Sequence, residues 1–367
     1  MTQAAPFLFS SNPARRRALH WLAAVTAICC IAAPAVAASG VGVAGPKGVA
    51  AAAAAAVTAA DARALSRANA AVVGVEAMAV EDARSIATLG RVRQGSGVLI
   101  GDDGLVLTIG YLVLEADHVD LVQADGRRVP ARVVAYDLAT GFGLVRALAP
   151  LGLQPVPLGA SATVSGDEPL MVASGGEAAD LSLARMVSRR AFSGYWEYHI
   201  EGALFTAPPR RDHSGAGLFN ASGELVGIGS LVVGDAAGRE APAMPGNMFV
   251  PVDLLKPILA ELTSRGASSG STRAWLGLNC VEYGGHVRVL RLTPDGPAED
   301  AGLQPGDLIA AVDGTPVADL ASFYKALWRD ERPEREVAVE IRRGTETIRL
   351  QVQAVDRMRT LSRPQGV

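Results

Sequence analysis

The sequence predicts a mainly β protein in which an all-β sandwich or barrel is followed by a smaller module of strands and helices. Short apolar runs separated by turns recur from residue 71 to about 252, a spacing typical of all-β folds. Glycine (40 residues) and proline (21 residues) are plentiful, which suits tight turns. A stretch rich in serine and glycine at 264–272 then separates a second pattern, which runs from about 273 to 356. A chain of 367 residues is long enough for both modules.

Residues 1–37 have the features of an export signal. Arg15, Arg16 and Arg17 form a positive region, a mostly apolar stretch follows at 18–33, and 35–37 (Ala-Val-Ala) has the pattern of a cleavage site. We therefore expect an exported, periplasmic protein. The alternative is an uncleaved signal that anchors the chain in a membrane, because the apolar stretch is only slightly short of a spanning helix.

Removal of the signal would also remove two of the three cysteines. Cys29 and Cys30 lie within it, so the mature chain keeps only Cys280. A single cysteine cannot form an internal disulfide, even in an oxidising compartment. Stability must then come from packed cores.

The β module is expected over 71–263, after an Ala/Gly-rich lead-in at 38–70 that contains a short helix near 61–69. Its expected strands include 96–100, 105–108, 119–123, 129–136 and 218–230, the last of these being interrupted by a turn at 221–223. Apolar residues at helical spacing predict an amphipathic helix over 251–262 that closes the module.

The second module is expected over 273–356, after a linker at 264–272 whose composition predicts flexibility. Its expected elements are a helix near 297–301, a strand at 308–312, a helix at 320–329 and a final hairpin that turns at 343–344. Residues 357–367 form a tail.

An ordered series of motifs resembles the HtrA (Do-type) trypsin-like serine proteases. In the first module these motifs are 95–100 (GSGVLI), 107–108 (LT), 125–127 (DGR), 136–137 (YD), 225–229 (LVGIG) and 249–251 (FVP). In the second module they are 275–278 (WLGL), 296–298 (GPA), 301–303 (AGL) and 306–309 (GDLI). Each motif is weak alone, but their order is specific, and the resemblance covers roughly 75–355. It implies a trypsin-like double β-barrel followed by a small α+β PDZ domain.

The sequence departs from the family at its catalytic triad. The resemblance places Ser214 at the nucleophile position, Tyr111 at the position of the family's His, and Gly141 at the position of its Asp. The oxyanion region falls on Asp212, His213 and Ser214, with Asp212 where the family has glycine.

This departure predicts impaired catalysis. A serine hydroxyl is a weak nucleophile without an adjacent base, and a phenol with a pKa around 10 accepts a proton poorly near pH 7. Gly141 has no side chain that could orient a base. An anionic Asp212 would oppose the developing oxyanion. His213 adjoins Ser214, but the members of a triad converge from separate elements. For His118, His199 and His286, a structural or surface role is the simpler interpretation.

The second module offers a candidate peptide site. The resemblance implies that the loop formed by Trp275, Leu276, Gly277 and Leu278 presents its amides to a C-terminal carboxylate, with the peptide added as a strand beside the long helix. Candidate pocket residues on that helix are Phe323, Tyr324 and Leu327. In the first module, the aromatic segment 195–198 (YWEY) is read either as the wall of a peptide cleft or as barrel core.

Composition narrows the class of function. The net charge of −3 gives no electrostatic reason to expect nucleic acid as a partner. No glycine loop for phosphates and no cluster of Cys and His with metal-ligand spacing occurs, so we expect no cofactor and no metal.

Three functions remain open. The leading hypothesis is an exported HtrA-like protein that binds peptides or unfolded chains with free C-termini. The alternatives are an endopeptidase that uses Ser214 with an unrecognised base, and a regulatory subunit, either a homo-trimer or a hetero-oligomer with active relatives, since the resemblance implies trimers.

Overall fold

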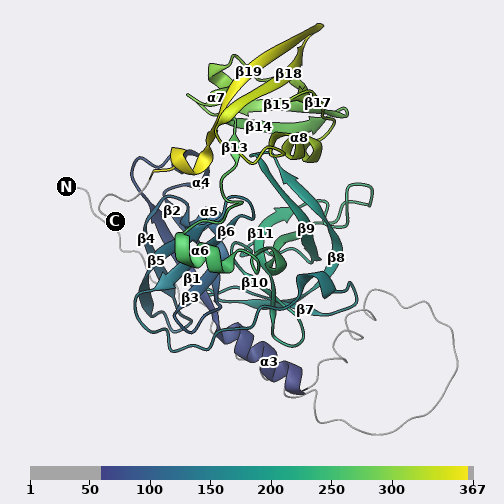
Figure 1. The fold of residues 1–367 in the computed structure, drawn as a ribbon. Coiled ribbons are helices and arrows are strands. Elements are labelled where there is room, and N and C mark those ends of the chain that lie inside the picture. Colours follow the sequence, from purple (N-terminus) through teal and green to yellow (C-terminus); the bar gives the residue numbers. More distant parts are fainter. Residues whose placement is uncertain (1–58, 363–367) are drawn as a thin grey trace, which may run out of the picture. The chain divides into compact units, whose positions relative to one another are not determined.

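The computed structural model describes residues 59–362, and the first of its three sheets is a closed six-stranded barrel. Its strands are β1 (Val72–Ala79), β2 (Val92–Leu99), β3 (Leu105–Ile109), β4 (Ala116–Val122), β5 (Arg128–Tyr136) and β6 (Phe142–Ala147). They follow the order β1-β2-β3-β6-β5-β4 around the barrel (Figure 1). All five residues of β3 are buried, which explains why this segment reads as a continuous apolar run.

The second barrel repeats this strand order. Its strands are β7 (Leu170–Ala173), β8 (Leu181–Gly194), β9 (Tyr198–Ala207), β10 (Gly217–Phe219), β11 (Leu225–Val233) and β12 (Gly246–Pro251). Their order of β7-β8-β9-β12-β11-β10 around the barrel matches that of the first barrel, strand for strand. The double β-barrel implied by the resemblance is therefore present, with the two barrels joined by residues 148–169 and the short η2 (Ser161–Thr163).

Helices at the ends of the double barrel differ in part from expectation. The short helix near 61–69 is confirmed as α3 (Ala59–Ala70), and two short helices, α4 (Ile86–Leu89) and α5 (Gly110–Val113), lie within the first barrel's chain. The single helix predicted over 251–262 is wrong: the chain forms η3 (Val252–Leu254) and then α6 (Leu259–Arg265). Pro257 lacks an amide proton and disfavours helical geometry in the residue before it, so the helix begins after it.

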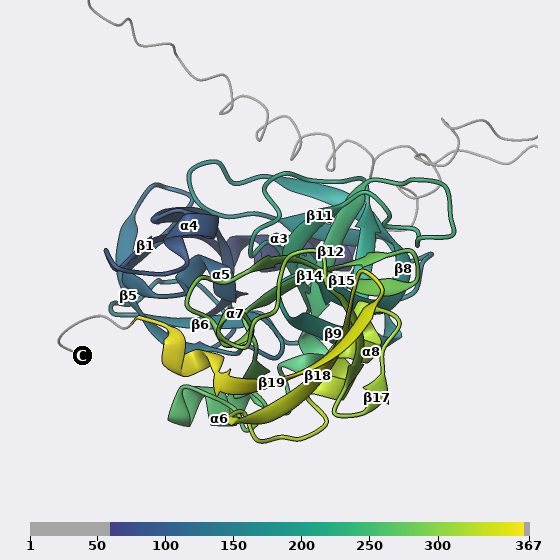
Figure 2. The ribbon, with the colours of Figure 1, turned by 90° about the horizontal axis from the view of Figure 1, so that it is seen from above.

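The third sheet belongs to the C-terminal module and follows the order β13-β19-β18-β16-β15-β14, with β17 beside β16. Its strands are β13 (Ala274–Trp275), β14 (Leu278–Tyr283), β15 (His286–Leu292), β16 (Leu308–Val312), β17 (Thr315–Pro316), β18 (Arg335–Arg343) and β19 (Glu346–Asp356). The predicted final hairpin is the long β18–β19 pair, drawn in yellow in Figures 1 and 2. Its helices are α7 (Pro297–Asp300), α8 (Leu320–Leu327) and the terminal η4 (Arg357–Thr360). Its core, drawn from residues 274–354, shares no buried side chain with the cores of the barrels.

The segment 264–272, predicted to be flexible, is instead tied to the first barrel. The fully buried Asp137, just after β5, accepts hydrogen bonds from the hydroxyls of Ser268, at 3.0 Å, and Ser271. Its other carboxylate oxygen accepts from the amide of Thr140, at 2.8 Å, and from the Thr140 hydroxyl. Serine promotes flexibility in a solvated linker, but here its hydroxyls find a buried acceptor. One carboxylate therefore orders both the β5–β6 turn and the path to the C-terminal module.

Replacing Asp137 with alanine should lower the free energy of unfolding by about 3 kcal/mol, because several buried donors lose their acceptor. Urea denaturation measures this loss, and hydrogen exchange should show 266–272 newly unprotected. Asp137→Asn keeps one acceptor oxygen, and its free energy of unfolding should lie between those of the wild type and of Asp137→Ala. Asp117→Ala, at an exposed carboxylate, is the control. Unchanged exchange at 266–272 in the alanine variant would contradict this role.

Candidate functional site

Ser214 lies in the loop between β9 and β10, which is clamped against the first barrel. The amide of Ser96, on β2, donates to the carbonyl of Ser214 at 2.8 Å. The next residue, Gly215, has a φ of +74°, and a Cβ there would lie 1.9 Å from the carbonyl oxygen of Ser96. Only glycine fits at this position. The sequence requirement at 215 thus fixes where the Ser214 hydroxyl stands relative to both barrels.

Tyr111, in α5, is the side chain that meets Ser214. Its hydroxyl lies 2.8 Å from Ser214 Oγ and 2.9 Å from the carbonyl oxygen of Ser230 on β11. A phenol has one proton, and a carbonyl can only accept. Tyr111 therefore donates to Ser230, and the Ser214 hydroxyl donates to Tyr111. The serine proton points at a phenol oxygen, where a base would be needed for catalysis.

The Tyr111 phenol is held neutral. Burial raises its pKa to about 12, and this effect outweighs the hydrogen bond with Ser214, which lowers the pKa. At neutral pH the anionic form that could accept the serine proton is therefore present at about one part in a hundred thousand. This phenol can hold the Ser214 hydroxyl in place but cannot activate it.

Arg93 on β2 positions Tyr111 through the backbone. Its guanidinium donates to the Tyr111 carbonyl at 3.0 Å, to the Gly90 carbonyl at 3.1 Å and to the Ser85 hydroxyl at 2.7 Å. Burial lowers the pKa of Arg93, and the nearby Glu115 carboxylate opposes that shift. Nothing in the sequence around Arg93 indicated this role, because the bonded residues come from several separate turns.

Gly141 also lies at this site, and aromatic side chains fill the space beside it. Its carbonyl accepts from the amide of Gly110, at 2.7 Å, directly before Tyr111. A Cβ at 141 would lie 3.0 Å from the Tyr198 hydroxyl, and the φ of +80° disfavours any side chain. Tyr198 in turn stacks on Trp196, with ring centroids 5.7 Å apart. The space that a side chain at 141 would need is thus occupied by Tyr198, from β9.

Asp212 differs from expectation. Its carboxylate is paired with Arg210, whose Nε donates at 3.0 Å, and it accepts the hydroxyl of Ser174. Burial opposes ionisation of Asp212, but the bonds from Arg210 and Ser174 outweigh it and lower its pKa. The negative charge expected at Asp212 is therefore present, but it is paired with Arg210, and the sequence alone did not show that Arg210 folds back onto it.

The four imidazoles of the described chain all have partners other than Ser214. His213 Nδ1 lies 2.9 Å from the carbonyl oxygen of Arg211, within the serine's own loop. The remaining pairs are His118 with Asp120, His199 with Ser193 and Glu201, and His286 with Arg342. Within residues 59–362, no histidine forms a hydrogen bond with the serine hydroxyl.

The candidate peptide site of the C-terminal module is closed in this structure. Its loop lies between β13 and β14, and Gly277 has the positive φ, +81°, that suits glycine. The side chains expected to line the site are buried: Trp275, Leu276, Leu278, Phe323, Tyr324 and Leu327. Tyr324 was expected in a peptide pocket, but its hydroxyl instead donates to the carbonyl of Gly194 in the turn between β8 and β9, at 2.6 Å.

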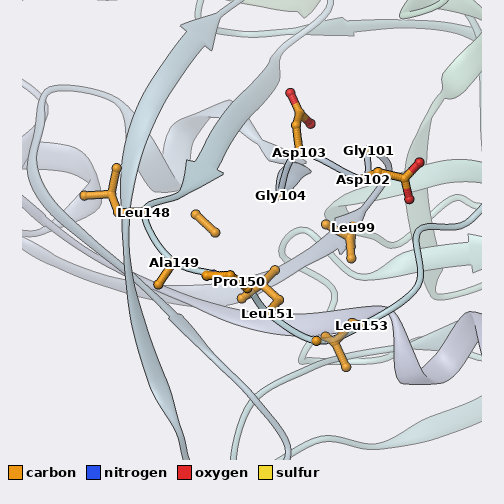
Figure 3. A pocket seen from close by; sticks show the side chains of 12 residues that line it. Leu99, Gly101, Asp102, Asp103, Gly104, Leu148, Ala149, Pro150, Leu151 and Leu153 are labelled. Atoms are coloured by element: carbon orange, nitrogen blue, oxygen red, sulfur yellow. The ribbon is translucent and has the colours of Figure 1, made fainter.

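A surface hollow lies elsewhere and lacks a catalytic arrangement. It is lined by residues 99–104 and 147–153, and in Figure 3 the carboxylates of Asp102 and Asp103 point away from its leucine and proline side chains. Within residues 59–362, no group of three or more His, Cys, Asp or Glu side chains is placed to hold a metal ion. No helix of that same range is long and apolar enough to cross a membrane.

Comparison with known proteins also indicates a trypsin-like peptidase domain followed by a PDZ domain. Residues 95–228 match the trypsin-like peptidase domain, and residues 274–354 match the PDZ domain. One similar solved structure is the HtrA-type protease AlgW with a decapeptide, at a TM-score of 0.52 and 20% identity, covering 81% of this chain and 98% of that one. The protein is a trypsin-like peptidase fold joined to a PDZ domain.

The similar sequences are those of serine endoproteases. The serine endoprotease DegS of Escherichia coli K12 is 27% identical over 272 residues, covering 70% of this chain and 75% of DegS. A DegP-like periplasmic serine endoprotease of Pseudomonas fulva is 28% identical over 267 residues, covering 68% of this chain but only 54% of that protein. The chain therefore resembles HtrA-type serine proteases in both of its domains, and it spans about half the length of its DegP-like relatives.

Replacing Tyr111 with phenylalanine should destabilise the fold by about 1–3 kcal/mol, because the buried Ser230 carbonyl loses its donor. The folded-state pKa of about 12 exceeds the ordinary value of 10, so the ionisation-linked part of this stability is complete below pH 10. It is lost as the pH rises from 10 through 12. Denaturation curves across this range measure the difference between variant and wild type. Tyr283→Phe, at an exposed phenol, should show no such difference.

Proposed function

We propose that this HtrA-type protein is exported and non-catalytic, and that it binds peptides or unfolded chains through its PDZ domain. The observation that carries the loss of catalysis is the bond between the Ser214 hydroxyl and a neutral phenol. Acyl transfer by serine needs a base that removes the hydroxyl proton as the nucleophile attacks. A tyrosine with a pKa of about 12 does not meet that need at neutral pH.

The surroundings of the serine support the same conclusion. A base at position 111 would need a partner to orient it, and the place for that partner holds the ring of Tyr198. The Tyr198 hydroxyl donates to the carbonyl of Thr140 at 2.6 Å, which fixes the ring in that place. Aromatic side chains therefore fill the space beside the serine. Endopeptidase activity that uses Ser214 is the alternative that the experiment below tests.

Export and peptide binding are supported from other parts of the chain. The basic and apolar segment at 1–37 lies outside the described residues, and the signal proposed for it rests on sequence alone. The DegP-like relatives are described as periplasmic. The loop 275–278 carries the amides that a PDZ domain offers to a carboxylate, and the similar AlgW structures hold a decapeptide or a tripeptide.

A fluorophosphonate probe should label the wild-type protein no more than Ser214→Ala. The double variant Tyr111→His with Gly141→Asp should also stay unlabelled, because the new side chain at 141 meets the Tyr198 hydroxyl and takes a strained backbone. Adding Tyr198→Ala to this double variant makes room for the side chain at 141, and the resulting triple variant is the matched comparison. Labelling of the wild type above the Ser214→Ala background, together with casein cleavage, would establish the endopeptidase instead.

The isolated segment 273–356, which has its own core, should bind a fluorescein-labelled hexapeptide that ends in valine with micromolar affinity, roughly −8 kcal/mol or weaker. Amidation of the peptide's C-terminus should weaken binding about tenfold or more, because charge-assisted hydrogen bonds to the loop amides are lost. Fluorescence polarisation measures both, after circular dichroism has established that the segment is folded. Equal affinity for the two peptides would argue against carboxylate recognition by the loop.

A further inference from the structure

The turn between β8 and β9 docks onto the PDZ domain at the two elements that form a peptide groove. It consists of Gly194, Tyr195, Trp196 and Glu197. On one side Tyr324, on α8, donates to the Gly194 carbonyl at 2.6 Å and accepts from the Glu197 amide at 3.1 Å. The other side of the turn meets the loop 275–278 and β14.

The Glu197 carboxylate lies in the carboxylate-binding loop. The amide of Leu276 donates to Glu197 Oε1 at 3.0 Å, and the amides of Gly277 and Leu278 also lower the pKa of this carboxyl. The side chain is 5% exposed. These three successive amides are those that a PDZ domain directs at the terminal carboxylate of a peptide. A side-chain carboxylate of the same chain has taken that place.

The backbone of the turn also pairs with β14 in the way expected of a peptide bound to a PDZ domain. The amide of Cys280, on β14, donates to the carbonyl of Tyr195 at 2.9 Å. Tyr195 stands two residues before Glu197, and Cys280 stands two residues after Leu278, the last of the loop amides. Residues two apart in an extended chain lie on the same side, so this spacing is that of a peptide that pairs with β14 from its C-terminus backwards.

We propose that the turn at 194–197 is an internal ligand of the PDZ domain, and that a peptide with a free C-terminal carboxylate enters the groove only by displacing it. The inference rests on the proposed peptide binding, which it deepens. Glu197 takes the place of the peptide's terminal residue, and Tyr195 takes that of the residue two before it. The external partner is a peptide that supplies both a carboxylate and an extended backbone.

The internal ligand fits the loop incompletely, which makes it displaceable. Glu197 Oε2 is buried and has no hydrogen-bond partner among the described residues. Glu197 also has a positive φ of 57°, which is strained for a residue with a side chain. A true C-terminus ends at its carboxylate and needs no such backbone. A peptide therefore gains the same amide bonds without this strain.

Protonation of Glu197 strengthens the docking of the turn. Burial raises the pKa of Glu197 from 4.5 to about 7, against the lowering effects of the loop amides and of Arg357, the charged group that faces it. The neutral Tyr324 and Cys280 face it from α8 and β14. The docked carboxyl binds its proton more tightly than a free one, so docking is strongest below pH 4.5 and weakens as the pH rises through 7.

Two further ion pairs join the turn's barrel to the PDZ domain, and in each of them at least one partner is largely exposed. Lys325 lies 2.7 Å from Glu201, and Arg239 pairs with Glu282. Exposed pairs of this kind contribute at most about 1 kcal/mol. The contacts that decide occupancy of the groove are therefore those of Glu197 and Tyr324, which are buried.

Competition for the loop should be visible in peptide affinity. If the groove is open in only a fraction of the molecules, the apparent dissociation constant rises by the inverse of that fraction. We expect full-length wild type to bind the valine-ending hexapeptide at least about tenfold more weakly than full-length Glu197→Ala. Tyr324→Phe loses both hydrogen bonds to the turn while the loop stays intact, and its affinity should rise in the same direction.

Matched variants separate the contacts. Glu197→Gln keeps an acceptor for the Leu276 amide and should stay close to wild type. Glu201→Gln, at an exposed carboxylate on the same strand, should change little. Peptide added to the wild type should raise hydrogen exchange at 194–197, because the turn is expelled. Wild type should bind the peptide more weakly than Glu197→Ala, and this difference in affinity should be larger at pH 5.5 than at pH 8.

The outcomes distinguish this inference from the proposed function. If segment 273–356 and every full-length variant fail to bind the peptide, the proposed peptide binding is wrong. If the segment binds but wild type, Glu197→Ala and Tyr324→Phe bind equally well, the turn is no competitor and the internal ligand is ruled out. Should Glu197→Ala fail to fold, Tyr324→Phe and the exchange at 194–197 still decide the question.

Discussion

The arrangement of the chain depends on one buried carboxylate, that of Asp137. It holds the β5–β6 turn through Thr140, and the same turn places Gly141 beside Tyr198. Through Ser268 and Ser271 it also fixes the segment that leads into the PDZ domain. Burying a carboxylate is costly unless its oxygens are bonded, and these oxygens together accept four hydrogen bonds. The surroundings of Ser214 and the segment that leads into the PDZ domain are thus positioned by the same carboxylate.

Ser214 lies in a trypsin-like double barrel, and aromatic side chains surround it. Gly215 still presses the serine loop against β2, and a side chain from α5 still reaches the serine hydroxyl. The groups that now meet there are a neutral phenol and a stacked pair of aromatic rings. Such groups stabilise a packed surface, whereas catalysis requires a group whose pKa lies near the working pH. Asp212, bonded to Arg210 and Ser174, adds to that packed surface.

Much of the fold was predictable because its signals are local. Strands such as 105–108 and 129–136 follow from apolar runs between turns, and the motifs in order indicated the double barrel and the PDZ domain. The contact of Tyr111 with Ser214 followed from the resemblance. What escaped prediction depends on long-range partners: Ser268 looks like linker until Asp137 is brought beside it. The aromatic segment 195–198 was read as cleft wall or barrel core. Half of it docks onto a domain that begins almost eighty residues later, and no local pattern shows this.

Tyr198 links the surroundings of Gly141 to the turn at 194–197. It fills the space that a side chain at 141 would need, and it stacks on Trp196, one residue before Glu197. The β8–β9 hairpin therefore contacts both the surroundings of Ser214 and the loop of the PDZ domain. Any displacement of this hairpin would alter the packing beside Gly141 and the occupancy of the PDZ loop together.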